Sequence, residues 1–152
     1  MFGQGDQSNN INNNPRTIPT NISGITCDKV EHLVYHNHTK LIINFQNETR
    51  NIPAGIGIIP NDCIFWLHTH DDSGIIHIES PIKNAFSLDQ FLNVWNTFDN
   101  SSFINNISKN DIPANVSMIL ENGSNIKSDD YKNLILENNA IITLDFDNKL
   151  KD

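Results

Sequence analysis

Short apolar runs separated by polar turns dominate the chain from Cys27 onward, a pattern typical of β-strands. Residues from Val30 to His38 alternate between apolar and polar types and run directly into an apolar segment at 41–45. The segment 51–58 contains Pro and Gly and is expected to be an edge strand or a loop. Further strands are predicted at 63–70, 75–79, 116–120, 134–136 and 141–146.

The period of the pattern changes at residues 87–95, where apolar residues recur at helical spacing. Ser87 can cap a helix here, because Gln90 follows three residues later, as a capping box requires. The apolar face of this helix, which is expected to lie in the core, consists of Leu88, Phe91, Leu92 and Trp95. The next segment, 97–112, is predicted to be a polar loop.

These segments amount to about six to eight strands and one amphipathic helix. We therefore expect a mainly β (α+β) fold, either a small antiparallel β-sandwich or an open barrel. Residues 1–24 hold few large apolar groups and are predicted to be a disordered tail or linker, because burial there cannot offset the entropy of ordering. Residues 25–152 are expected to form a single β-rich domain.

The net charge of −8 and the absence of any Lys/Arg cluster argue against nucleic acid or an anionic membrane as a partner, because both bind basic surfaces. No apolar run reaches the ~18 residues that a membrane-spanning helix needs, so direct membrane insertion is not expected. The first residues also lack the charged and apolar regions of a signal peptide. We expect either a cytosolic protein or a chain that starts after a removed anchor or signal.

The two cysteines, Cys27 and Cys63, are far apart in the sequence, and neither has a CxxC partner. A thioredoxin-type or zinc-ribbon motif is therefore absent. Three possibilities stay open from the sequence: two buried free thiols, one disulfide in an exported protein, or metal ligation by one of them.

Residues 67–79 carry three histidines and a glutamate on a predicted β-hairpin. Ser73 and Gly74 are expected to form its two-residue turn, because such turns need the positive φ that glycine tolerates. Counting outward from this turn gives the register of the two strands. The predicted pairs are Asp72 with Ile75, Asp71 with Ile76, His70 with His77, Thr69 with Ile78, and His68 with Glu79.

Side chains alternate between the two faces of a strand, so this register collects three imidazoles and a carboxylate on one face. Opposed Cβ atoms lie about 4.5–5.5 Å apart, which brings the four groups within reach of one metal ion. Neutral imidazoles with one anion suit a divalent transition metal, with copper or zinc expected. The predicted ligands are His68, His70, His77 and Glu79, and the opposite face carries Leu67, Thr69, Ile76 and Ile78.

A second His-x-His pair, His36 and His38, lies in another strand-like segment, and His32 falls on the same face. His36 and His38 could complete the hairpin site or form a second one. The alternative for all of these residues is a solvated surface, on which His68 and Glu79 form a simple pair.

The motifs at 52–58, 63–71, 74–81 and 86–91 resemble those of a group of small, poorly characterised proteins from archaea and bacteria, many with an N-terminal anchor or signal. The resemblance spans about residues 27–146 and is specific around the LHTHD and SGIIHIESP segments of the hairpin. It implies a β-rich domain located outside the cytoplasm, and it adds His36 and His38 to the site. It implies no particular reaction, and this chain departs from the group in lacking an anchor.

Three functions are compatible with these observations. The first is an extracytoplasmic metal-binding protein for copper or zinc handling, delivery or sensing. The second is a metalloenzyme with an open coordination position, for which Asp71 or Asp72 could supply a base, although both are equally good turn residues. The third is a metal-free structural or interaction domain. The sequence identifies no protein partner.

Overall fold

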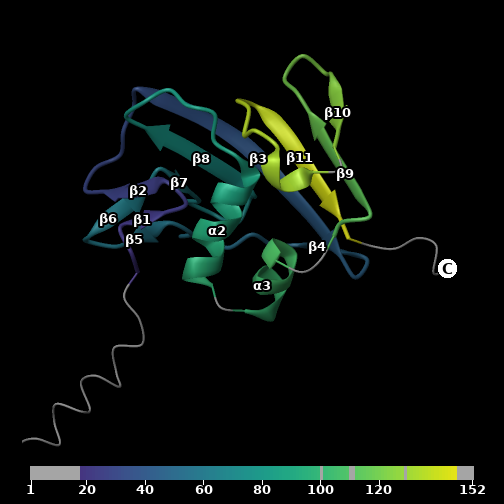
Figure 1. Ribbon diagram of the computed structural model, residues 1–152, viewed down its shortest axis with the longest axis horizontal. Coiled ribbons are helices and arrows are strands. Elements are labelled where there is room, and N and C mark those ends of the chain that lie inside the picture. The colour runs from purple at the N-terminus through teal and green to yellow at the C-terminus, as the bar shows by residue number, and fades with distance from the viewer. Residues whose placement is uncertain (1–17, 100, 110–111, 129, 147–152) are drawn as a thin grey trace, which may run out of the picture.

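The computed structural model describes residues 18–99, 101–109, 112–128 and 130–146, and shows two open β-sheets with two short helices (Figure 1). The predicted mainly β fold is therefore confirmed. The strands are β1 (Asn21–Ile22), β2 (Ile25–Asp28), β3 (Tyr35–Phe45), β4 (Glu48–Arg50), β5 (Ile58–Ile59), β6 (Cys63–Phe65), β7 (Leu67–His68), β8 (Ile75–Ser80), β9 (Asn115–Ile119), β10 (Asn125–Lys127) and β11 (Ala140–Asp145). The helices are α2 (Leu88–Phe98) and α3 (Ser102–Lys109), and η1 (Tyr131–Asn133) is a 3-10 turn.

The larger sheet has the strand order β10-β9-β11-β3-β8-β7, with β4 also paired to β3. All of its pairings are antiparallel except that of β11 with β3, which is parallel. The smaller sheet has the order β1-β2-β6-β5 and is antiparallel throughout. The long strand β3 therefore lies in the middle of the larger sheet, next to β8.

The chain passes from the smaller sheet to the larger one at Trp66. Its backbone N–H donates to the carbonyl of Thr26 in β2 of the smaller sheet (3.2 Å), and its own carbonyl accepts from the N–H of Glu79 in β8 (2.8 Å). The predicted continuous strand at 63–70 is thus wrong, because the two hydrogen-bonding groups of Trp66 serve different sheets. It is split into β6 and β7.

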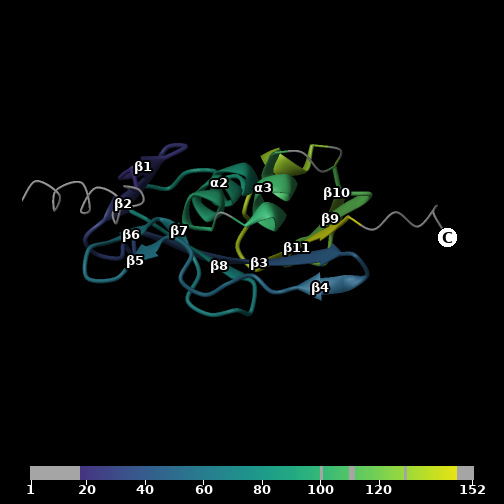
Figure 2. The same ribbon diagram turned by 90° about the horizontal axis from the view of Figure 1, so that it is seen from below.

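Both helices lie on the same side of the larger sheet (Figure 2). Alternate residues of β3 and β8, including Leu41, Ile76 and Ile78, are buried and belong to the hydrophobic core with the apolar face of α2. The predicted capping box of α2 is confirmed: Ser87 Oγ accepts from the N–H of Gln90, and Gln90 Oε1 accepts from the N–H of Ser87. The remaining alternate residues of β3 and β8 point to the face away from the helices.

The prediction of a polar loop at 97–112 is wrong, because α3 lies there. Ile104 and Ile107 are three residues apart and fully buried, and Phe103 packs against the same core, so a short apolar stripe docks this helix. Ser101 Oγ accepts from the N–H of Ile104 (3.4 Å) at its first turn. The segment is polar overall and in this respect resembles a loop, although its few apolar residues do recur at helical spacing.

Three predicted boundaries also change. The strand expected from Val30 begins only at Tyr35, and the apolar side chains of the intervening loop are exposed. Residues 134–136 form an isolated bridge to Ser87 rather than a sheet strand. Strand structure begins at Asn21, earlier than the predicted boundary at 24, while residues 1–17 of the predicted tail lie outside the described residues.

No helix in the described part of the chain is long and apolar enough to cross a membrane.

Candidate metal centre

Three neighbouring strands of the larger sheet carry a row of histidines. His38 of β3 pairs with His77 of β8, and His77 pairs in turn with His68 of β7. One step along, His36 of β3 pairs with Glu79 of β8. These five residues belong to the face that points away from the helices, so the sheet itself aligns them.

The predicted register of the hairpin is wrong by two residues. His77 is opposite His68, not His70, and Glu79 lies opposite His36 on its other side. The predicted set of residues on one face is retained nevertheless, because side chains alternate with a period of two and a shift of two preserves the face. The two strands are joined by a longer loop instead of a two-residue turn.

Thr69 explains this longer loop. Its hydroxyl donates to the carbonyl of Pro53 (2.7 Å) and accepts from the N–H of Ile56 (3.1 Å), and its N–H donates to the carbonyl of Ile56 (3.0 Å). Thr69 is fully buried in these contacts and is unavailable to pair with Ile78. Residue pairing along the hairpin therefore stops at His68.

The loop that follows holds His70 beside the row. Asp71 accepts from both the N–H (3.1 Å) and the hydroxyl (2.6 Å) of Ser73, which makes it a turn residue rather than a free base. Gly74 has a φ of +89°, and its carbonyl accepts from the N–H of Leu41 (2.8 Å). A Cβ at Gly74 would lie 2.5 Å from the carbonyl oxygen of Leu41, so the close approach of loop and β3 requires glycine.

Glu31 is a site residue that the sequence analysis missed. The loop between β2 and β3 places its Oε2 3.3 Å from Nε2 of His70 and 3.7 Å from Nε2 of His68. A single acid in a loop carries no periodic signal that could have identified it. His32, by contrast, does not join the cluster, because its Nε2 is 2.7 Å from Oδ2 of Asp28.

Two groups of potential ligands result, and in each group the ligand atoms lie within 4.8 Å of one another. All six predicted metal ligands belong to one group or the other. The first group is His36, His38 and His77, and the second is Glu31, His68, His70 and Glu79. Glu79 also reaches the first group, since its Oε2 is 3.1 Å from Nε2 of His36 and 3.9 Å from Nδ1 of His77.

No protein-family model, curated protein or solved structure matches this chain. The chemistry of the site therefore has to follow from its own geometry.

Three buried side-chain atoms in the described part of the chain have no hydrogen-bond partner, and all three lie in this cluster. They are His68 Nε2, His77 Nδ1 and Glu79 Oε1. His68 Nε2 and Glu79 Oε1 are 3.2 Å apart without hydrogen-bonding geometry. Buried polar atoms are nearly always satisfied in folded proteins, so three such atoms in one cluster are suited to binding a cation.

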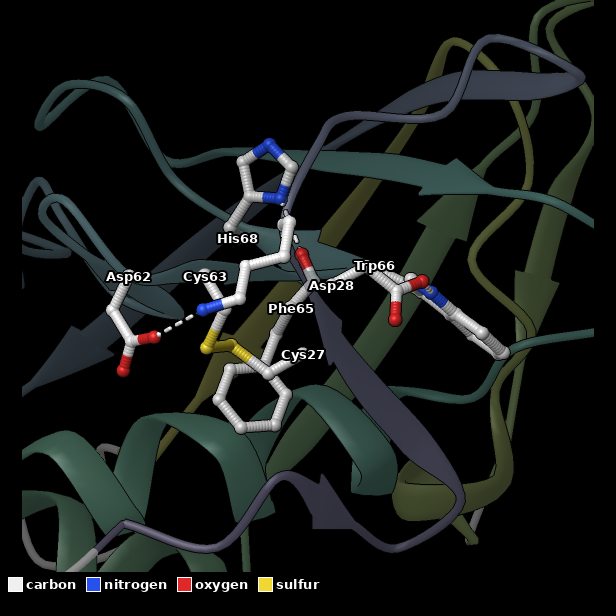
Figure 3. Close-up of a disulfide and its surroundings, with 8 residues drawn as sticks. Cys27, Asp28, Asp62, Cys63, Phe65, Trp66 and His68 are labelled. Carbon is white, nitrogen blue, oxygen red and sulfur yellow. Dashed lines mark hydrogen bonds and ion pairs between the residues drawn. A yellow bond between two sulfur atoms is a disulfide. The ribbon is translucent and has the colours of Figure 1, made fainter.

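A hydrogen bond to the backbone fixes the orientation of the His68 ring. Its Nδ1 is 2.6 Å from the carbonyl oxygen of Phe65 and donates to it (Figure 3). This leaves the Nε2 lone pair facing Glu31 and Glu79. The same arrangement, with one imidazole nitrogen donating to a carbonyl and the other facing the ion, is usual for metal-ligating histidines.

The electrostatics keep the imidazoles of His68 and His77 neutral at neutral pH. Burial lowers the pKa of His68 to about 4, against the opposing effect of the Phe65 carbonyl. Burial, together with the neighbouring imidazoles, also lowers the pKa of His77 to about 4. Burial and the proximity of Glu31 raise the pKa of Glu79. Two lone pairs are thus available at neutral pH, and a cation would favour the ionised form of the glutamate.

A disulfide joins β2 to β6 beneath this site. Cys27 and Cys63 are bonded, with their Cα atoms 5.4 Å apart (Figure 3). The free-thiol and metal-ligand possibilities for these cysteines are therefore excluded. Next to Cys27, Asp28 Oδ2 accepts from the indole Nε1 of Trp66 (2.8 Å), so the disulfide and this bond hold the start of β7 in place.

The spacing of the ligand atoms fits a transition-metal ion. Tetrahedral zinc with ligands at about 2.0–2.1 Å has ligand atoms about 3.3 Å apart. Three distances are close to this spacing: 3.1 Å for His36 Nε2 to Glu79 Oε2, 3.2 Å for His68 Nε2 to Glu79 Oε1, and 3.3 Å for His70 Nε2 to Glu31 Oε2. Two are wider, at 3.7 Å for His68 Nε2 to Glu31 Oε2 and 3.9 Å for His77 Nδ1 to Glu79 Oε2. The imidazole and carboxylate donors suit Zn(II) and Cu(II).

Proposed function

We propose that this chain is a transition-metal-binding protein that acts outside the cytoplasm, in the handling, delivery or sensing of copper or zinc. The observation that carries the proposal is the set of three buried, unpartnered atoms within one cluster of histidines and glutamates: His68 Nε2, His77 Nδ1 and Glu79 Oε1. Divalent metal binding within this cluster would satisfy them.

A metal-free structural role accounts less well for the same residues. Each buried polar group without a partner costs about 1–3 kcal/mol, and the cluster contains three of them. If His68 and Glu79 formed a simple pair on a solvated surface, both side chains would be exposed. Instead, His68 is 0% exposed and Glu79 is 6% exposed. Metal binding supplies a physical reason for keeping these groups buried.

The extracytoplasmic location is proposed on two grounds. Disulfides persist mainly in oxidising compartments, and Cys27 is bonded to Cys63. The hairpin motif also resembles that of small proteins that carry anchors or signals. Both features favour a site outside the membrane, where metal ions are captured or exchanged.

A metalloenzyme is the second candidate, and the exposure of part of the cluster favours it. Glu31 and His70 are each 42% exposed, so one side of the cluster faces solvent. Catalytic ions keep a position for water or substrate, and this side could supply one. Asp71 is not assigned as the base, because its carboxylate is held in the turn by Ser73.

The test is metal analysis and titration of protein purified without a histidine tag. We expect co-purifying copper or zinc, and a rise in unfolding free energy of about 2.7 kcal/mol when free Zn(II) is at 100 times its dissociation constant. His70→Ala combined with His77→Ala should remove this stabilisation. His32→Ala is the matched control, because His32 is paired with Asp28 outside the cluster, and it should bind metal normally. No bound metal and no stabilisation by Zn(II) or Cu(II) would overturn the proposal.

A further inference from the structure

The cluster contains more ligands than one ion needs. Five imidazoles and two carboxylates make up its two groups. A tetrahedral ion of the zinc type takes four ligands, so a single ion would leave part of this set unused. The unused groups would include buried atoms, because unpartnered atoms belong to both groups: His77 Nδ1 to the first, and His68 Nε2 and Glu79 Oε1 to the second.

Glu79 lies between the two groups, with one carboxylate oxygen directed at each. Its Oε2 is 3.1 Å from His36 Nε2, and its Oε1 is 3.2 Å from His68 Nε2. The pairing of strands produces this arrangement, since β8 lies between β3, which carries His36, and β7, which carries His68. Its carboxylate is nearly fully buried and therefore has few alternative orientations.

From this geometry we infer that the site is dinuclear and that Glu79 bridges two divalent transition-metal ions, an inference that rests on the proposed metal-binding function. The first ion takes His36, His38, His77 and Glu79 Oε2. The second takes Glu31, His68, His70 and Glu79 Oε1. Each ion then has four protein ligands, and no ligand of either group is left over.

The two ions differ in their surroundings. The second ion has the fully buried His68 as a ligand together with Glu31 and His70, which come from loops. The ligands of the first ion other than Glu79 are all imidazoles from strands. A bridging carboxylate holds two ions about 3.5–4 Å apart, which is the separation found in two-metal sites.

Stoichiometry distinguishes this inference from the proposed function. Isothermal titration with Zn(II) should give two ions per chain in the wild-type protein. His38→Ala and His70→Ala each remove one ligand from one group and should each leave one ion. His32→Ala should keep two. One ion in the wild type, or loss of all binding in both single variants, would overturn the dinuclear site and leave the proposed function standing. No binding at all would overturn both.

The bridge has a separate spectroscopic test. Loading with two equivalents of Cu(II) should give a spin-coupled electron paramagnetic resonance spectrum with a half-field transition, and His38→Ala should give the spectrum of an isolated ion. Glu79→Gln keeps the size of the side chain and should abolish the coupling and weaken binding of the second ion by at least about tenfold. Glu48→Gln, at an exposed acid of β4, is the matched control and should retain the coupling. Two uncoupled ions in the wild type, or coupling unchanged in Glu79→Gln, would overturn the bridge.

Discussion

A single glycine sets the distance between the His70 loop and strand β3. Gly74 combines a left-handed φ of +89° with a carbonyl that accepts from Leu41, at a separation that leaves no room for a Cβ. Gly123 has a similar φ of +92°, but nothing lies within 4 Å of the position of its Cβ. An added Cβ would therefore meet an unfavourable φ at both glycines, but a steric clash only at Gly74.

We predict that Gly74→Ala lowers the free energy of unfolding by more than Gly123→Ala does. The strained φ costs about 1 kcal/mol at either position, and displacement of the loop adds to this cost at Gly74 only. Gly74→Ala should also weaken Zn(II) binding, because His70 moves with the loop, whereas Gly123→Ala should not. Urea unfolding and Zn(II) titration measure the two effects. Equal losses of stability in the two variants would show that the contact with Leu41 is easily relieved.

The buried imidazoles make the stability of the metal-free protein depend on pH. An unfolded histidine has a pKa near 6.5, whereas burial holds the pKa of His68 and His77 at about 4. Between these values the unfolded chain binds more protons than the folded one, so the free energy of unfolding falls as the pH falls. The raised pKa of Glu79 acts in the opposite direction, because the folded state holds its proton more tightly.

We therefore predict that stability in the presence of a chelator declines from about pH 6.5 to about pH 4, with two histidines outweighing one glutamate. Urea unfolding across this range measures the decline. Replacing both His68 and His77 with Gln should make this decline less steep, although the lowered pKa of His38 still contributes to it. His32→Gln should leave the decline as steep as in the wild type. A pH-independent wild type in this window would contradict the burial of neutral imidazoles.

At the scale of elements, the alternation of residues predicted the site far better than the turn did. Period-two alternation placed His68, His77 and Glu79 on one face, and that face survives any even shift in register. The turn prediction failed because it treated Ser73 and Gly74 in isolation. What sets the register is Thr69, whose partners lie in the 53–56 loop, and no local pattern shows such a contact.

Glu31 and α3 were missed for a related reason. Glu31 reaches the cluster only because the β2–β3 loop folds over β7, a tertiary arrangement that its own sequence does not encode. Helix α3 is amphipathic, but it is short and mostly polar, and packing against α2 stabilises it. Contacts between segments that are distant in the sequence are not predicted by the pattern of residues along the chain.

The buried contacts of Thr69 set the register of the hairpin and can be tested directly. Thr69→Val keeps the shape of the side chain but removes a hydroxyl that both donates and accepts in a buried position, so it should cost about 1–3 kcal/mol of stability. It should also weaken metal binding, because β7 and the His70 loop lose their anchor. Thr49→Val removes an exposed hydroxyl bonded to Asn44 and is the matched control. An unchanged metal affinity in Thr69→Val would show that the loop keeps its position without these bonds.

At the scale of the whole molecule, the disulfide and the proposed ions reinforce the same junction between the two sheets. The disulfide joins β2 to β6, immediately before the chain crosses at Trp66 into the larger sheet. The cluster then joins β7 to β8 and β3 through His68, Glu79 and His36. Both features act on the short crossing segment, which has few residues of its own to stabilise it.

We predict that replacing Cys27 and Cys63 with Ala costs about 2–4 kcal/mol, because the disulfide closes a loop with a sequence separation of 36 and limits the unfolded chain. Since Cys27 and Cys63 are not ligands, the variant should still bind Zn(II), and saturating Zn(II) should raise its stability by about as much as that of the wild type. Urea unfolding with and without Zn(II) gives the stabilisation by Zn(II) in the wild type and in the variant, and the two values can then be compared. A much larger gain from Zn(II) in the wild type than in the variant would mean that the disulfide preorganises the site, because the cysteines themselves take no part in binding.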